Sequence, residues 1–445
     1  MRSFAVKCAC PLKGEVRLPA DKSIAHRYII AASLSPAKIR IENFPTNEDC
    51  LHTLSALKKI GVRIKESKSR SGLGLNLMVF GRGLRGLEKP KSPIFVGDSG
   101  TTLRLLLGVL AGQDFRVTLT GGESLSQRPM RRVTQPLRLM GAHIVSRLSS
   151  LAPREENIPI TIKGGDLKPI TYKMPVASAQ VKSAILLAGL FADGATRVIE
   201  PVKTRDHTER ILKVFKADIK VKGNTIVIKG NKALASLNKI YLPADISSAS
   251  FFIVAALLCP GSKIKIKGVT LNPTRTGALR VLRRMGADIK ITSYKSQIAS
   301  YEPMGDIVVK SSRLRGTVVR KNEIPSLIDE LPILMVAAAL AKGRTVFEGV
   351  GELRVKETDR IRSMSENLKK MGADIQIKAR CRQESILITG VNLLKQATVR
   401  SFGDHRTAMS MIVAGLRAQG TTKIDDIACI KKSFPAFLGT FNKIL

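Results

Sequence analysis

One sequence pattern occurs six times along this 445-residue chain, and it restricts the possible fold more than any other feature. Each copy starts with small or polar residues, continues as an apolar helix, breaks at Gly or Pro, and ends in a short basic strand. The breaks fall at Pro36, Gly112, Gly194, Gly261, Gly343 and Gly420. In five copies a second helix follows and ends in an echo such as LRRMGADI from Leu282 or LKKMGADI from Leu368. Alternating helices and strands predict an α/β fold of six repeated βαβαββ-type units.

The sixth unit lacks closing strands, because the chain ends soon after its second helix. The segment from Phe4 to Pro19 reads as strand and precedes the first helix, so we expect it to pair into the C-terminal half. Three units then make each of two similar lobes. The predicted lobes are residues 21–243, and residues 1–20 together with 244–445.

The sequence LPAD occurs at both predicted crossings between the lobes. It spans Leu18 to Asp21 and again Leu242 to Asp245, which predicts hinges near residues 19–21 and 242–245. The first helix of each unit is strongly apolar, so we expect these helices to be buried in parallel inside each lobe, with the sheets outside.

The starts of these helices carry small polar or charged residues, as in DKS, GDSGTT and GDHRT. Taken singly, they are ordinary N-caps. Several positive helix ends that converge with Lys and Arg on one gap between the lobes would form an anion site. The segment ELRVKETDR, from Glu352 to Arg360, is interpreted as the first turns of a helix on which Lys356 and Arg360 share a face beside Glu357. A solvated helix face is the simpler alternative for that segment.

The composition indicates an anionic partner. The formal net charge is +39, which suits nucleic acid, a membrane surface or phosphorylated metabolites. Aromatic residues make up only 4 % and Trp is absent, which argues against single-stranded nucleic acid. The longest apolar run, near Phe251 to Cys259, is far shorter than the roughly 20 residues that a membrane span needs. The six scattered cysteines include no CxxC pair, so we expect no zinc and a cytoplasmic protein with reduced thiols.

Nine short motifs follow one another in a characteristic order, although none is specific alone. They are LPADKSIAHR from Leu18, GDSGTTLR from Gly97, SQRPM from Ser126, PVASAQVKSA from Pro175, TRDHTER from Thr204, IDELP from Ile328, RVKETDR from Arg354, GDHRTAM from Gly403 and KSFP from Lys432. In this order, and over nearly the whole chain, they resemble the 5-enolpyruvylshikimate-3-phosphate (EPSP) synthase family, the 3-phosphoshikimate 1-carboxyvinyltransferases.

The resemblance implies an enolpyruvyl transferase with the family's inside-out α/β barrels. That family transfers the enolpyruvyl group of phosphoenolpyruvate to the 5-hydroxyl of shikimate 3-phosphate and releases phosphate through a tetrahedral intermediate. The reaction belongs to the shikimate pathway of aromatic amino-acid (chorismate) biosynthesis, and the family is the target of glyphosate. The resemblance implies no metal and no organic cofactor, small-molecule substrates without nucleic acid or membrane, and a cytoplasmic monomer.

The resemblance also assigns roles to individual residues. The catalytic residues are Asp329 as the base for the 5-hydroxyl or its partner, Glu357 as the acid at the methylene carbon, and Lys22, which contacts both substrates and can move a proton. The shikimate 3-phosphate ligands are Lys22, Ser23, Arg27, Ser178, Ala179, Gln180, Arg205, Asp329 and Lys356. The phosphoenolpyruvate ligands are Lys22, Gly100, Arg128, Gln180, Arg360, Arg406 and Lys432. Bidentate guanidinium contacts suit both the carboxylate and the phosphate.

Two positions depart from the residues common in the family, and at two others the role of a residue depends on its size or direction. Ala179 stands where many members have Ser, so one hydroxyl contact is lost or is replaced by a backbone N–H. Asp98 stands where many members have Asn, and its carboxylate must pair with a cation or turn away from an anionic substrate. Gly100 has no side chain to crowd the site, so we expect glyphosate to enter. Glu330 follows Asp329 directly, and helical geometry should place the two on different faces.

Two alternatives remain at this point. A UDP-N-acetylglucosamine enolpyruvyl transferase would typically have Lys-Asn where this chain has Lys22 and Ser23. It would usually also carry a reactive Cys in its second repeat, and this chain has none between Cys50 and Cys259. The net charge also suits a nucleic-acid-binding or end-processing protein, but the few aromatics and the six regularly spaced helix starts argue against that class.

Overall fold

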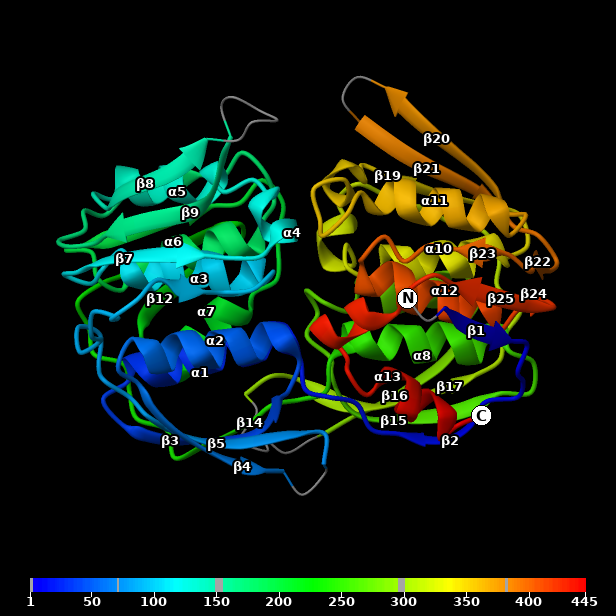
Figure 1. The fold of residues 1–445 in the computed structure, drawn as a ribbon, viewed down its shortest axis with the longest axis horizontal. Coiled ribbons are helices and arrows are strands. Elements are labelled where there is room, and N and C mark those ends of the chain that lie inside the picture. The colour runs from blue at the N-terminus through cyan, green and yellow to red at the C-terminus, as the bar shows by residue number, and fades with distance from the viewer. Residues whose placement is uncertain (1–2, 70–71, 149–154, 295–300, 381–382) are drawn as a thin grey trace. The chain divides into compact units, whose positions relative to one another are not determined.

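A computed structural model describes residues 3–69, 72–148, 155–294, 301–380 and 383–445. They form two compact units, each with its own apolar core (Figure 1). The N-terminal unit comprises Ala20–Leu242. The C-terminal unit is made of the described residues within Met1–Pro19, Pro243–Ser296 and Glu302–Leu445.

Three repeats build the N-terminal unit, each with a central helix, an outer helix and a four-stranded sheet. The central helices are α1 (Lys22–Leu34), α3 (Gly100–Leu110) and α6 (Ala179–Gly189), and the outer helices are α2 (Glu48–Lys59), α5 (Arg131–Leu139) and α7 (His207–Val214), with a short α4 (Glu123–Ser126). The strands are β3 (Lys38–Pro45), β4 (Arg63–Lys68), β5 (Gly74–Phe80), β6 (Ile94–Phe95), β7 (Arg116–Thr120), β8 (His143–Leu148), β9 (Glu156–Lys163), β10 (Thr171–Lys173), β11 (Ala195–Ile199), β12 (Asp218–Lys222), β13 (Thr225–Lys229) and β14 (Lys239–Tyr241). The three sheets share one order: β14-β3-β5-β4, β6-β7-β9-β8 and β10-β11-β13-β12.

The C-terminal unit repeats this plan with shorter strands at its end. Its central helices are α8 (Ile246–Leu258), α10 (Leu331–Ala339) and α12 (His405–Gly415), and the others are α9 (Gly277–Arg284), α11 (Arg360–Lys370), α13 (Phe437–Asn442) and the 3-10 helices η1 (Ile324–Ser326), η2 (Gly351–Leu353) and η3 (Ala428–Lys432). The strands are β1 (Phe4–Lys7), β2 (Lys13–Val16), β15 (Lys263–Thr270), β16 (Asp288–Ser293), β17 (Met304–Lys310), β18 (Val318–Val319), β19 (Arg344–Glu348), β20 (Asp374–Arg380), β21 (Gln383–Thr389), β22 (Leu394–Lys395), β23 (Thr398–Val399), β24 (Ala418–Gln419) and β25 (Thr421–Ile424). The sheets are β2-β15-β17-β16, β18-β19-β21-β20, β1-β25-β23 and β22-β24.

The N-terminal strands pair into the C-terminal unit, as the incomplete sixth repeat predicts. β1 runs antiparallel to β25, with Phe4 opposite Ile424. β2 runs parallel to β15, with Lys13 opposite Lys263. The segment therefore completes two repeats, because β1 closes the sixth and β2 joins the sheet of the fourth.

The central helices are buried on every side, whereas the outer helices are buried on one face only. All residues of α8 are buried, and so are all residues of α10 and α12. Helices that are apolar all round can only be stable inside a core, so the sheets cover them from outside, as Figure 1 shows for each unit. Within their units α3 contacts both α1 and α6, and α10 contacts both α8 and α12. The prediction of buried helices inside outer sheets is confirmed.

Side-chain caps begin five of the six central helices. The cap residues are Asp21, Ser99, Ser178, Asp245 and Asp404. The interpretation of these residues as N-caps is therefore confirmed for five starts. The sixth helix, α10, has no side-chain cap and carries Pro332 in its first turn, where a missing N–H costs no helical hydrogen bond.

The expected helix start in ELRVKETDR is wrong. α11 begins only at Arg360, because Asp359 has an extended backbone and its side chain accepts a hydrogen bond from Arg362 N at 3.0 Å. Lys356 and Glu357 therefore lie in the loop before the helix and not on its face. The capping interaction fixes where the loop ends and the helix begins. An i,i+4 charge pattern alone does not predict that boundary.

Within the described ranges, no helix combines the length and the apolarity needed to cross a membrane. Five cysteines are free thiols, of which Cys8 and Cys10 are exposed and Cys50, Cys259 and Cys429 are buried. Cys381 lies outside the described residues.

We expect Gly108→Ala to destabilise the protein, because the backbones of α3 and α6 lie close together at this glycine. A Cβ at Gly108 would lie 2.3 Å from Ala184 O, so the two helix backbones would have to separate. Overpacking of this kind costs about 1–3 kcal/mol of the free energy of unfolding. Gly439→Ala in α13 is the matched control, since a Cβ there meets nothing within 4 Å.

The control should be neutral or stabilising by up to about 1 kcal/mol, because Ala has the higher helix propensity. Urea unfolding followed by circular dichroism measures both variants. Equal stability of the two would contradict the close approach of α3 and α6.

Candidate functional site

Arg360 lies at the centre of a charged group in the C-terminal unit. It is the first residue of α11 and only 1 % exposed. Its Nε lies 2.9 Å from Asp404 Oδ2, its Nη1 3.5 Å from Asp329 Oδ1, and its Nη2 2.5 Å from Glu357 Oε2. Burial alone would lower the pKa of Arg360, but Asp404, Glu357 and Asp329 outweigh it and raise the pKa above its ordinary value. The guanidinium is therefore permanently charged.

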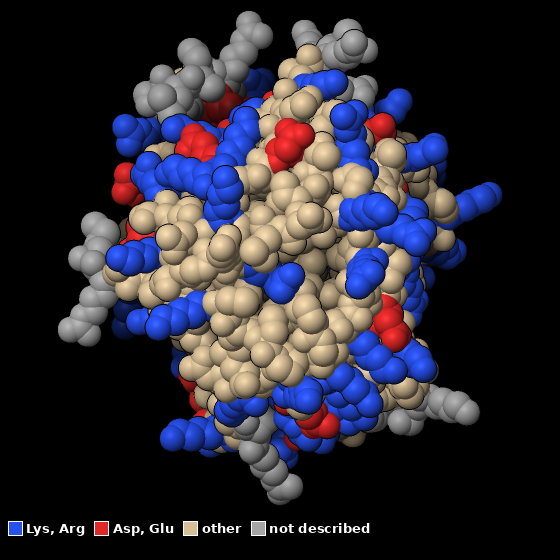
Figure 2. All heavy atoms as spheres, turned by 90° about the vertical axis from the view of Figure 1, so that its right-hand side faces the viewer, with Lys and Arg blue, Asp and Glu red and all other residues tan. Residues whose placement is uncertain are grey.

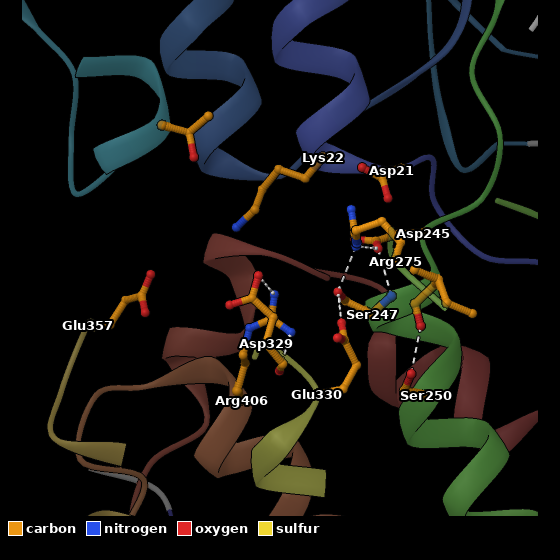
Figure 3. Close-up of polar contacts among 12 residues, drawn as sticks. Asp21, Lys22, Asp245, Ser247, Ser250, Arg275, Asp329, Glu330, Glu357 and Arg406 are labelled. Carbon is orange, nitrogen blue, oxygen red and sulfur yellow. Dashed lines mark hydrogen bonds and ion pairs between the residues drawn. The ribbon is translucent and has the colours of Figure 1, made fainter. Parts of the chain in front are cut away.

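Asp329 lies between two guanidinium groups. Arg406, the second residue of α12, donates from Nη1 to the Asp329 backbone oxygen at 2.8 Å, and its Nη2 lies 3.6 Å from Asp329 Oδ2 (Figure 3). On the other side, Arg360 lies 3.5 Å from Asp329 Oδ1. Cations in this arrangement can bind a carboxylate or phosphate, while the carboxylate between them is placed to exchange a proton.

Glu330 points away from Asp329, toward α8 (Figure 3). It accepts a hydrogen bond from Ser247 Oγ and is 1 % exposed. Arg275 Nη2 in turn donates to Ser247 Oγ at 2.9 Å and to Asp245 Oδ1 at 3.2 Å. The two acids do face different ways, but the expected reason was wrong. Both precede α10, so a turn separates their directions and not helical periodicity.

Lys356 is the third cation of this group. Burial lowers the pKa of Lys356 from 10.5 to about 8, although the carboxylate of Asp329 raises it. Arg360 lowers it further, as a like charge nearby must. This ammonium can therefore lose its proton at mildly alkaline pH, unlike an ordinary surface lysine.

The remaining predicted residue of the C-terminal unit is Lys432. It is the last residue of η3, and η3 packs against α12, the helix that carries Arg406. The structure thus brings Asp329, Lys356, Glu357, Arg360 and Arg406 together and places Lys432 on a segment that contacts one of their helices.

A second charged group occupies the helix starts of the N-terminal unit. Lys22, the first residue of α1, forms an ion pair with Asp49 of α2 at 2.9 Å between Nζ and Oδ2. Arg27 is buried and donates from Nε to Thr208 Oγ1 at 2.8 Å and from Nη2 to Ser183 Oγ at 2.9 Å. These bonds fix the guanidinium between α1, α6 and α7.

The first turn of α6 supplies three further predicted residues. Ser178 caps the helix, and Ala179 and Gln180 are its first two residues. Ser23 is the second residue of α1, and its backbone oxygen accepts a hydrogen bond from Arg27 Nη1 at 2.8 Å. Free N–H groups at such a helix start favour an anion.

Gly100 begins α3 where two guanidinium groups approach its backbone. A Cβ at this position would lie 2.6 Å from Arg104 Nη1 and 2.8 Å from Arg128 Nη1, so a larger residue would require these two flexible side-chain ends to shift. Arg104 Nη1 also donates to Gln180 Oε1 at 2.7 Å. The predicted entry of glyphosate beside Gly100 stays a prediction.

Arg205 lies in the loop before α7, and a buried ion pair holds this loop. Glu200 Oε1 accepts a hydrogen bond from Thr204 N at 3.1 Å, and Glu200 Oε2 lies 3.1 Å from Nζ of the buried Lys182 on α6. The loop is thereby tied to the helix whose first turn carries Gln180.

Asp98, the residue that departs from the family pattern, contacts the backbone of α4. Its Oδ1 accepts a hydrogen bond from Leu125 N at 3.2 Å. A carboxylate at the first turn of a helix is favourable there, which gives this side chain a local structural role.

Two functional candidates were missed from the sequence. Asp404 Oδ1 accepts hydrogen bonds from Arg406 N at 2.7 Å and Thr407 N at 3.1 Å, while its Oδ2 binds Arg360. The cap could be anticipated from GDHRT, but the partner lies 44 residues away along the chain. Arg104 of the second repeat donates to Gln180 of the third and so orients it. The motif GDSGTTLR does not indicate this partner.

Comparison with known proteins identifies the family. The model of the family described as EPSP synthase (3-phosphoshikimate 1-carboxyvinyltransferase) matches residues 6–441. The chain belongs to the EPSP synthase family. A 3-phosphoshikimate 1-carboxyvinyltransferase of Desulforamulus reducens is 46 % identical over 434 residues, covering 98 % of this chain and 97 % of that protein. The protein of the same name from Petrotoga mobilis is 47 % identical over 435 residues, covering 97 % of each.

A solved structure gives the same family. The EPSP synthase of Acinetobacter baumannii superposes with a TM-score of 0.85 at 40 % sequence identity, covering 100 % of this chain and 98 % of that chain. The fold predicted from the repeats, with helices inside and sheets outside in two similar units, is thus an EPSP synthase fold.

Two substitutions of Asp404 should distinguish its contribution as a helix cap from its contribution as the ion-pair partner of Arg360. Asp404→Asn keeps an oxygen for the N-cap but removes the charge that faces Arg360, which should lower the free energy of unfolding by roughly 1–3 kcal/mol. Asp404→Ala also removes the cap and should cost about 1 kcal/mol more. Glu366→Gln is the control, because its pair with Arg362 on the same helix is exposed.

Chemical denaturation measures all three variants, and the control should unfold like the unchanged protein. Asp404→Asn with unchanged stability would show that the buried ion pair contributes nothing net.

Lys356 should titrate near pH 8. Asp329→Asn should lower its pKa further, because it removes the carboxylate that raises it most, and Glu357→Gln should lower it less. NMR of protein with 13C-labelled lysine ε-carbons measures these values, and Lys356→Arg assigns the signal. A Lys356 signal that titrates like the other lysines would contradict the burial of this ammonium.

Proposed function

We propose that this chain transfers the enolpyruvyl group of phosphoenolpyruvate to the 5-hydroxyl of shikimate 3-phosphate and releases phosphate. The observation that carries the proposal is the similarity, over nearly the whole chain, to proteins that bear the name of this activity. The arrangement of Asp329 between Arg360 and Arg406 supports it, because this reaction needs both anion binding and proton transfer.

The proposed roles are those that the family resemblance implies, and the groups that the side chains present suit them. Arg128, Arg360, Arg406 and Lys432 bind the phosphate and carboxylate of phosphoenolpyruvate, with Gly100 and Gln180 beside them. The shikimate 3-phosphate ligands are Ser23, Arg27, Ser178, Ala179, Gln180, Arg205, Asp329 and Lys356, and Lys22 contacts both substrates. Bidentate guanidinium contacts give these anions both charge and orientation.

The chemistry proceeds by addition and then elimination. The 5-hydroxyl oxygen bonds to C2 of phosphoenolpyruvate while Asp329 takes the hydroxyl proton and Glu357 gives a proton to the methylene carbon. The resulting tetrahedral intermediate then loses a proton from its new methyl group, and the bond from C2 to the phosphate oxygen breaks. Phosphate leaves with the electron pair, and the enolpyruvyl group remains on the acceptor.

We propose that the two compact units act as the catalytic lobes, with bounds near residues 21–243 and 1–20 plus 244–445. We further propose a cytoplasmic monomer that uses no metal or organic cofactor and binds no nucleic acid.

Phosphate release from phosphoenolpyruvate tests the function. Purified protein with a chelator receives shikimate 3-phosphate, UDP-N-acetylglucosamine or no acceptor. We expect release only with shikimate 3-phosphate, because the acceptor hydroxyl must attack before phosphate can leave. Release only with the sugar nucleotide would overturn the proposed substrate, and release that needs an added metal would overturn the cofactor proposal.

Two variants tie the activity to the charged group. Asp329→Ala and Glu357→Ala should each lower kcat by roughly 10²–10⁴-fold, the usual contribution of a positioned acid or base. The exposed Glu366→Gln on α11 should leave kcat unchanged. A near-normal kcat in either alanine variant would remove that residue from the proposed proton transfers.

A further inference from the structure

A hollow of about 960 Å³ lies at the C-terminal ends of the three central helices of the C-terminal unit. Leu258 of α8, Leu340 after α10 and Arg417 after α12 all line it. The proposed catalytic residues Asp329 and Arg406 lie at the other ends of these helices, roughly 15 Å away along α10. The hollow is therefore separate from the substrate-binding residues.

The charged residues that line this hollow are all cations. They are Arg313, Arg315, Lys342 and Arg417. No Asp or Glu lines it, and none of the four forms an ion pair with any described residue. Elsewhere in the same unit Arg284 pairs with Glu323 at 3.0 Å, whereas Arg280 contacts only neutral oxygens. Like charges around one hollow repel one another unless an anion lies between them.

Helix dipoles do not account for these cations. Three helix C-termini contribute about −0.5 elementary charge each, so roughly +2.5 of the four positive charges stays uncompensated. The terminal carbonyls are already occupied. Leu257 O accepts a hydrogen bond from Ser312 N at 2.9 Å, and Ala339 O accepts one from Val391 N at 2.8 Å.

The repeated fold provides an internal comparison, because the N-terminal unit has the same helix ends. Glu88 corresponds to Arg315, because Glu88 N donates to Ile60 O as Arg315 N donates to Met285 O, and each follows the last strand of the first repeat in its unit. Glu88 forms an ion pair with Arg82. The C-terminal unit therefore has a cation where the N-terminal unit has an acid.

The third repeats of the two units also differ, and again the C-terminal unit has the cation. In the N-terminal unit Ala192 forms a parallel bridge to Leu167, and in the C-terminal unit Ala418 pairs with Leu394 in the same way. The residues before the two alanines, Phe191 and Arg417, therefore correspond to each other. Phe191 is 1 % exposed and packs on Gly112, where a Cβ would lie 2.0 Å from its ring. An aromatic ring thus fills the helix ends in one unit, where the other has a cation beside a hollow.

We propose that this hollow binds a small polyanion, a molecule with several phosphate or carboxylate groups and an apolar body. The cations supply the charge, and buried Leu257, Leu314 and Ala341 supply an apolar floor. Its volume lies in the range of small-molecule sites. Figure 2 shows Lys and Arg side chains around a hollowed part of one face of the molecule.

Calorimetric titration with ATP in the absence of magnesium tests the proposal, and inorganic tripolyphosphate is the second probe. The double variant Arg315→Gln/Arg417→Gln should weaken the binding of ATP at least about tenfold, because two contacts to charged groups are lost. The matched control is Arg82→Gln/Arg85→Gln, which removes the same charge at the corresponding helix ends of the N-terminal unit. The control should change the Kd less than about twofold.

The tripolyphosphate arm distinguishes the two sources of phosphate. Tighter binding of ATP shows that the ring contacts the apolar floor, and equal binding shows recognition of the phosphates alone. Equal losses in both double variants would overturn the proposal, since general charge would then explain the binding. The absence of binding for both probes would overturn it as well.

The variants also allow for effects on folding. Phosphate release with shikimate 3-phosphate should be unchanged in both double variants, because neither touches the proposed substrate residues. If Arg315→Gln/Arg417→Gln does not fold, Arg313→Gln/Lys342→Gln replaces it, with the same expected loss and the same control.

Discussion

The burial of six largely apolar central helices is the constraint on which the rest of this structure depends. A helix such as α8, with every residue buried, has no face for water, so sheets must surround it. Each unit meets this demand with three central helices inside three layers of strands. The polar chemistry is thereby confined to the helix ends and to the loops that leave them.

The helix starts combine capping with charge binding. Asp404 caps α12 and holds Arg360 with the same carboxylate, so one side chain orients the helix and a guanidinium together. Arg360 in turn contacts Asp329 and Glu357, which leaves the acids and cations of this group mutually positioned. In the N-terminal unit, Arg27 is fixed in a comparable way by hydroxyl groups of two other helices.

The opposite helix ends show that the two units have diverged. Phe191 closes the core of one unit, while Arg417 stands beside the hollow of the other. Four of the cations behind the net charge of +39 line this hollow. The repeat makes this visible, because each unit serves as the reference for the other.

The sequence by itself determined the repeat number, the buried helices, five of the six caps and the family. Apolar periodicity and cap residues are local signals, and nine ordered motifs span nearly the whole chain. The pairing of β1 and β2 also followed from the sequence, because the sixth repeat was visibly incomplete.

Only the tertiary structure decided which charges meet. In the structure α11 begins at Arg360, and a turn directs Glu330 away from Asp329. Arg360 pairs with Asp404, an acid 44 residues away along the chain. The tertiary structure also lowered the pKa of Lys356 to about 8. Such contacts depend on packing between distant repeats and on burial, and neither leaves a pattern in the local sequence.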